Sequence, residues 1–164
     1  MIRYIVYTLL AATLLGAAAT PASAQDDKYF GLGFIIGEPT GIDAKLFLNN
    51  TNALEFGAAW SLDNDEAFHL QADYLWHRYN LIKLNNQDEL PLYFGIGARM
   101  VVRDDDDFPG DSGDDIFGIR FPVGLDYLFY NYPFDIFAAI VPILDVAPDS
   151  DFDLEGCIGA RFWF

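Results

Sequence analysis

Residues 152–164 read FDLEGCIGARFWF, and this stretch decides the fold. Its even positions are Phe, Leu, Gly, Ile, Ala, Phe and Phe, whereas its odd positions are Asp, Glu, Cys, Gly, Arg and Trp. Side chains of a β-strand alternate between two faces. One face is therefore apolar and the other mixes charged with small residues, and this period of two predicts a β-strand.

The same alternation recurs through the chain, without a convincing helical period. It predicts eight strands, at 29–36, 42–48, 54–62, 68–78, 90–102, 117–127, 134–145 and 152–164. Turn-forming residues lie between them, as hairpins require. The strand at 134–145 is apolar on both faces over its middle, so the sequence leaves its inward side open.

The polar faces of these strands indicate the interior of a narrow barrel. They mix glycine and alanine with charges of both signs, and a closed eight-stranded barrel has room for little more than side chains. Because an unpaired buried charge is costly, near-balance of sign predicts a salt-bridge network that plugs the lumen. A narrow ion path is the alternative. The predicted network is Asp43, Lys45, Glu55, Asp73, Arg99, Arg120, Asp126, Glu155 and Arg161.

The apolar faces predict contact with lipid. They are rich in Phe, Leu and Ile, and carry aromatic residues near strand ends, at Trp60, Trp76, Tyr127, Phe162 and Phe164. An apolar band with aromatic girdles is typical of membrane barrels. The predicted fold is all-β, an eight-stranded antiparallel up-and-down transmembrane β-barrel. A soluble lipocalin-like barrel, with its apolar faces around a ligand, is the alternative.

Residues 1–24 have the three parts of a secretory signal peptide. Arg3 gives a positive start, residues 5–19 form an apolar run, and Ala22-Ser23-Ala24 offers a cleavage site after Pro21. A transmembrane anchor is the alternative, but the apolar run is short for one. We expect a cleaved signal at 1–24 and a barrel domain at 25–164.

Charge and cysteine content exclude several classes of protein. Asp and Glu number 25 against 9 Lys and Arg, for a formal charge of −16, which argues against nucleic-acid binding. The single cysteine, Cys157, excludes an intramolecular disulfide scaffold. We expect it to face inward as an inert small residue. The sequence predicts no cofactor.

An acidic loop at 103–115 is the one candidate metal site. Carboxylates on a flexible loop suit hard divalent cations such as Ca²⁺. Weak cation binding, bridging to lipopolysaccharide phosphates, is therefore weighed against a merely solvated, self-repelling loop. The candidate ligands are Asp104, Asp105, Asp106, Asp107, Asp111, Asp114 and Asp115.

Catalysis is not predicted. Ser61 and His69 would lie on one side of a hairpin, with Glu55 or Asp73 able to orient the histidine. No nucleophile motif surrounds Ser61, so we expect no enzyme, and a lipid-modifying activity is the least favoured alternative. His77, next to Trp76, is expected to be a membrane-interface histidine.

The signal peptide, the eight strands and the terminal phenylalanine resemble the small eight-stranded bacterial outer-membrane barrels of the OmpA-like and OmpX-like type. Segments 37–41, 72–77, 118–124 and 149–155 further resemble a functionally uncharacterised family of such barrels. The resemblance implies that the barrel-assembly machinery reads the C-terminal segment with Phe162 and Phe164. We expect a monomer surrounded by outer-membrane lipid and lipopolysaccharide.

Loop lengths predict the orientation. Counting back from a periplasmic C-terminus, the connections at 37–41, 62–66, 103–115 and 146–151 lie outside, and those at 49–52, 80–89 and 130–133 are periplasmic. Both termini would then be periplasmic. The expected role is structural or surface-interacting.

Overall fold

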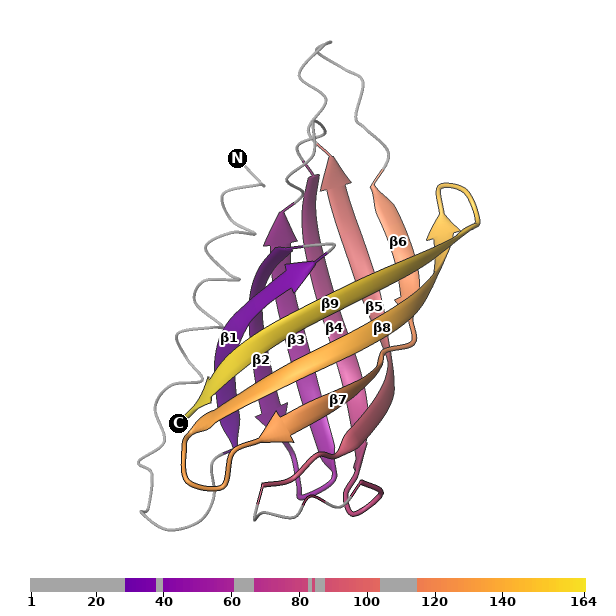
Figure 1. Cartoon of the computed structure of the whole chain (residues 1–164). Helices are drawn as coiled ribbons and strands as arrows, with labels where there is room; N and C mark the ends of the chain where they lie inside the picture. Colours follow the sequence, from indigo (N-terminus) through magenta and orange to yellow (C-terminus); the bar gives the residue numbers. More distant parts are fainter. Residues whose placement is uncertain (1–28, 38–39, 61–66, 83, 85–87, 104–114) are drawn as a thin grey trace.

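A computed structural model describes residues 29–37, 40–60, 67–82, 84, 88–103 and 115–164 of the chain. These residues form nine antiparallel strands wrapped into a barrel (Figure 1). The strands are β1 Phe30–Gly37, β2 Thr40–Phe47, β3 Asn52–Trp60, β4 Ala67–Arg78, β5 Leu92–Arg103, β6 Ile116–Arg120, β7 Val123–Leu128, β8 Phe134–Ala147 and β9 Asp151–Trp163.

The sheet closes on itself as an up-and-down barrel. Consecutive strands pair from β1 to β6 and from β7 to β9, and β1 closes the ring by pairing with β9, so that Gly31 lies opposite Trp163. β6 and β7 share one place in the ring, because both lie between β5 and β8. The ring therefore has eight positions, as the sequence predicts. The predicted signal peptide at 1–24 lies outside the described residues.

The predicted strand at 117–127 is interrupted at Phe121-Pro122 rather than continuous. Pro122 has no N–H to donate to a neighbouring strand. Its carbonyl still accepts the N–H of Gly95 at 2.8 Å, and the N–H of Phe121 donates to the carbonyl of Pro142 at 2.9 Å. The register is unchanged across the gap, so β6 and β7 act as one strand with a local break.

Burial alternates along the strands as the sequence pattern predicts. β8, whose inward side the sequence left open, buries Asp135, Phe137, Ala139, Val141, Ile143 and Asp145. Its alternate residues face outward, among them Ile136 and Ile140, which are more than half exposed. No helix among the described residues is long and apolar enough to cross a membrane.

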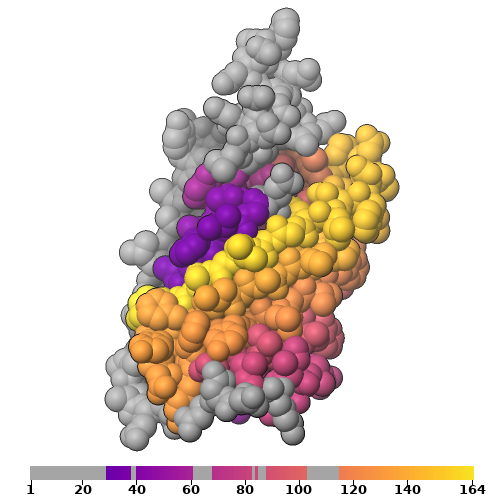
Figure 2. Space-filling model, in the orientation of Figure 1, coloured from indigo at the N-terminus to yellow at the C-terminus, as the bar shows by residue number. Residues whose placement is uncertain are grey.

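The exterior of the barrel is apolar. By strand alternation the outward positions of the nine strands carry a single charged residue, Arg78, at the last position of β4. In the space-filling view, side chains of β1, β9 and β8 form a continuous part of this outer wall (Figure 2). The exposed residues of this surface include Phe34, Ile36, Ile42, Phe56, Ile96, Ile119, Val123, Leu144 and Ile158.

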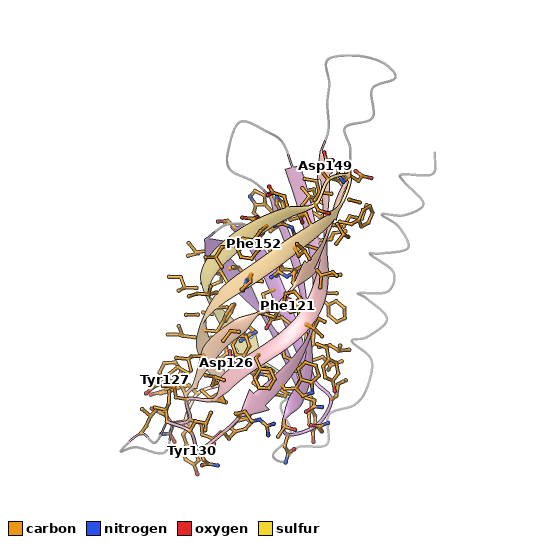
Figure 3. The ribbon with its side chains drawn as sticks, turned by 90° about the vertical axis from the view of Figure 1, so that its right-hand side faces the viewer. Phe121, Asp126, Tyr127, Tyr130, Asp149 and Phe152 are labelled. Atoms are coloured by element: carbon orange, nitrogen blue, oxygen red, sulfur yellow. The ribbon has the colours of Figure 1, made fainter. Side chains whose placement is uncertain are left out.

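Aromatic residues gather at the end of the barrel that holds the C-terminus. Phe162 packs edge-on against Phe134 and Phe164, with ring centroids 5.1 and 4.8 Å apart. Tyr127 and Tyr130 lie at the same end (Figure 3). Such a belt of rings is typical of a membrane–water interface.

Candidate functional site: the charged interior of the barrel

The structure brings together inside the barrel the nine charged residues of the predicted network. Each residue of the predicted network is less than a tenth exposed. They come from β2, β3, β4, β5, β6, β7 and β9, so most strands of the ring contribute to the charged lumen. Ion pairs arrange these side chains in two groups.

The first group centres on Arg161 of β9. Its Nη1 donates to Glu55 Oε2 at 2.6 Å and to Asp43 Oδ2 at 3.2 Å, and its Nη2 donates to Asp126 Oδ1 at 2.7 Å. Its Nε donates to Asp135 Oδ2 at 3.1 Å. One guanidinium thus serves four carboxylates, using the fixed fork of donors that only arginine provides.

Lys45 completes this group. Its ammonium Nζ lies 2.6 Å from Asp126 Oδ2 and 3.7 Å from Glu55 Oε2, and its side chain is fully buried. Nζ also lies 4.6 Å from the centre of the Tyr93 ring, and the Arg161 guanidinium lies 4.0 Å from the centre of the Phe137 ring. The faces of aromatic rings attract cations, so these two rings add to the stabilisation that the carboxylates give Lys45 and Arg161.

The second group centres on Arg99 and Arg120. Arg99 donates to Asp145 Oδ2 at 2.7 Å, to Glu155 Oε1 at 2.6 Å and to Asp153 Oδ2 at 3.0 Å. Arg120 donates to the second oxygen of Glu155 at 2.9 Å and to Asp73 Oδ1 at 3.2 Å. Glu155 therefore bridges the two arginines. The two groups adjoin where Glu55 and Asp73 lie opposite each other on β3 and β4.

Three members of the network, Asp135, Asp145 and Asp153, were missed by the sequence analysis. Asp135 and Asp145 lie near the two ends of β8, whose middle is apolar on both faces, so the sequence left open which side of this strand faces inward. Asp153 lies on the polar face of β9. It accepts a hydrogen bond from Arg99 of β5, a contact between distant strands that the sequence pattern does not report.

With these three, the balance of charge differs from the near-balance we expected. Eight carboxylates take part in the ion pairs with Lys45, Arg99, Arg120 and Arg161: Asp43, Glu55, Asp73, Asp126, Asp135, Asp145, Asp153 and Glu155. Among the described side chains the lumen therefore holds more acidic than basic groups, and of these eight carboxylates only Asp153 is substantially exposed, its side chain at 49%.

His77 is an interior residue, so the expectation that it lies at the membrane interface is wrong. It is 1% exposed, with Nε2 3.2 Å from Asp126 Oδ2 and Nδ1 3.3 Å from the carbonyl of Thr51. Its position on the polar face of β4 was the signal for this placement, and the neighbouring Trp76 points the other way. His69 lies on the same face of β4, and Ser61 is outside the described residues.

The other candidate residues lie elsewhere or outside the described part. Asp104, Asp105, Asp106, Asp107, Asp111 and Asp114 are not described, and Asp115 is exposed. Among the described residues, no group of three or more His, Cys, Asp or Glu side chains has the arrangement of a metal site. Cys157 is a free thiol, partly buried on the inward face of β9.

Two solved structures share the architecture of this barrel. The crystal structure of the N-terminal β-barrel domain of Pseudomonas aeruginosa OprF matches with a TM-score of 0.60 at 14% identity, over 85% of this chain and 100% of that chain. The crystal structure of Neisserial surface protein A (NspA) matches with a TM-score of 0.51 at 11% identity, over 84% and 98% of the two chains.

No protein-family model matches the sequence, and the comparison with curated protein sequences gives no match either. The narrower resemblance to one functionally uncharacterised family therefore stays a prediction. The resemblance to the OmpA-like and OmpX-like barrels is confirmed at the level of architecture. The chain has the all-β, eight-stranded antiparallel fold of the small outer-membrane barrels.

Proposed function

We propose that this chain is an integral protein of a bacterial outer membrane, with a lumen closed by its charge network and a structural or surface-interacting role. The observation that carries the proposal is the sorting of charge by side of the wall. Buried charged side chains fill the interior, whereas the outward strand positions carry only Arg78. A barrel in water would carry its charges on the outer surface and its apolar residues inside. Membrane hydrocarbon instead excludes charge from the outward face.

Cell fractionation combined with gel mobility tests this proposal. The protein is expected in the outer-membrane fraction, and the unheated protein in detergent is expected to migrate differently from the boiled one, because a closed barrel stays folded until heated. Protein found in the soluble periplasmic fraction, with no mobility shift, would contradict the proposal.

The orientation follows from the distribution of the connections. We place both termini and the aromatic end of the barrel on the periplasmic side, and the acidic connections on the outer side, where divalent cations bridge carboxylates to lipopolysaccharide phosphates. The same count of connections assigns the predicted acidic loop at 103–115 to the outer side, and residues 104–114 of this loop lie outside the described residues. We further propose a monomer without enzymatic activity.

The C-terminal segment is proposed as the signal for the barrel-assembly machinery. Phe164 also closes the ring, since its N–H donates to the carbonyl of Phe30 at 2.9 Å and its ring lies 6.1 Å from the Phe30 ring. Deletion of Phe164 is expected to reduce the amount of heat-modifiable protein in the outer membrane several-fold. Unchanged amounts in quantitative blots, measured against the matched exchange Phe164→Tyr, would contradict this role.

A narrow cation path is the second candidate function, and the excess of buried carboxylates favours it. Asp43 Oδ1 and Tyr93 Oη also have no hydrogen-bond partner among the described residues, and buried polar atoms are normally bonded to protein or water. Planar-bilayer recording separates the two candidates. The closed barrel is expected to give no unitary current, whereas a cation-selective current that Arg120→Met increases would support the path.

A further inference from the structure

One strand of the barrel has an unpaired edge. The pairing of β9 with β1 ends where Cys157 lies opposite Gly37, but β9 starts six residues earlier, at Asp151. On its other side β9 stays paired with β8 as far as Asp151, opposite Asp145. Among the described residues, no strand covers the β1 side of residues 151–156. Figure 1 shows the β8–β9 hairpin running past the end of β1.

Within residues 151–154, the backbone hydrogen-bonding groups that face this edge belong to Phe152 and Leu154. Leu154 lies opposite Pro142, whose carbonyl accepts from Phe121 on the far side of β8. The backbone groups of Pro142 therefore point away from β9, and those of Leu154 point away from β8. Phe152 is two residues from Leu154, so its N–H and C=O face the same way.

In the described part of the chain, the two edge N–H groups bind only neighbouring side chains. The N–H of Phe152 donates to Asp151 Oδ1 at 2.9 Å, and that of Leu154 donates to Asp153 Oδ1 at 2.8 Å. Such local side-chain bonds compete with a strand ladder rather than form part of one. An incoming strand can exchange them for its own carbonyl oxygens.

The edge lies in water on the outer side, a step that rests on the proposed function. An unpaired strand edge is excluded from hydrocarbon, because its backbone groups would be unsatisfied there. Asp149, Asp151 and Asp153 surround the edge, and Phe152 and Leu154 are 66% and 59% exposed. Asp149 and Phe152 lie at the end of the barrel away from Tyr127 and Tyr130 (Figure 3).

We propose that residues 151–154 of β9 dock an extended segment of another protein by strand addition, and that this segment alternates basic with apolar residues. Strand addition uses main-chain hydrogen bonds for affinity and alternate side chains for specificity. Here the alternate positions are apolar at Phe152 and Leu154 and acidic at Asp151 and Asp153, of which Asp153 keeps one oxygen on Arg99. A second copy of this edge would set like charges opposite each other, which disfavours self-pairing.

Peptide binding to the folded full-length protein in detergent tests the proposal. The probe is a fluorescent peptide of alternating Lys and Val, compared with the same peptide N-methylated along one edge. Leu154→Pro removes an edge N–H that no bond to β8 uses, and edge positions tolerate proline. N-methylation and Leu154→Pro are each expected to weaken binding at least about tenfold, and Leu154→Ala, which keeps the N–H, by less than about threefold.

Several results would overturn the proposal. Equal binding of the N-methylated peptide, or of the unmethylated peptide to Leu154→Pro, would show that the backbone edge is not the site. Equal binding of a Glu–Val peptide would overturn the basic partner, and self-association that Leu154→Pro abolishes would identify a second copy as the occupant. If Leu154→Pro fails to fold, the N-methylated peptide gives the same test on the unchanged protein.

The same peptide on intact cells separates this proposal from the proposed function. Binding to the purified protein and also to cells that express it supports both. Binding to the purified protein without binding to intact cells supports the edge site and contradicts its outward orientation. Binding to neither contradicts the edge site, while fractionation still decides the location.

Discussion

Replacement of Arg161 with methionine is expected to lower the free energy of unfolding of the barrel by about 3–5 kcal/mol, the usual cost of removing one partner from a buried ion pair. Methionine keeps much of the side-chain length but no donor. The guanidinium pairs with Asp43, Glu55, Asp126 and Asp135. In the variant, Lys45 is the only Lys or Arg among the described residues that still pairs with any of the four, through Glu55 and Asp126. Denaturant titration of the refolded barrel in lipid vesicles, followed by tryptophan fluorescence, measures the loss.

Two further variants show that the loss comes from the network. Arg78→Met, at the exposed end of β4, is the matched control and is expected to change stability by less than about 0.5 kcal/mol. Arg161 is the only cation paired with Asp135 among the described residues, so Asp135→Asn is expected to recover part of the loss in the Arg161→Met background. A cost below about 1 kcal/mol for Arg161→Met would contradict a tightly paired interior.

The side of the wall on which each charge lies could be predicted from the sequence, because the period of two holds in most strands. Asp43 and Lys45 on β2 alternate with apolar neighbours, and so do Arg99 on β5 and Arg161 on β9. In a closed barrel, residues that face the interior alternate with residues that face the exterior along every strand, so the polar positions of a strand lie either in the lumen or on the outer surface. The glycines mixed with these charges then favoured the inside.

The partners of each charge could not be predicted, because they depend on the register and tilt of the strands. Arg161 meets Asp126 on β7, and Arg99 meets Asp145 on β8, across distances along the chain that no local pattern reports. β8 gave no alternation at all over its middle. Its inward side chains there are Phe137, Ala139, Val141 and Ile143, which supply apolar packing between Asp135 and Asp145.

A methyl group added at Gly159 is expected to destabilise the barrel by about 1–3 kcal/mol, the typical cost of overpacking. Gly159 lies opposite Phe137 on β8, and a Cβ built there would lie 2.6 Å from Cε1 of that ring and closer still to Cζ and to the Phe34 carbonyl oxygen. Phe137 cannot move freely, because the Arg161 guanidinium lies over its ring. The Gly159→Ala variant is measured by the same denaturant titration.

Gly156→Ala is the matched control on the same strand, because a Cβ at Gly156 meets no atom within 4 Å. It is expected to be neutral or slightly stabilising, since alanine has less conformational freedom than glycine in the unfolded chain. Gly159→Ala combined with Phe137→Leu is expected to cost less than the two single changes together, because the smaller side chain leaves room for the methyl group. Equal stabilities of Gly156→Ala and Gly159→Ala would mean that the lumen has room beside Phe137. The second candidate function, a path for cations, would then be favoured over the closed barrel.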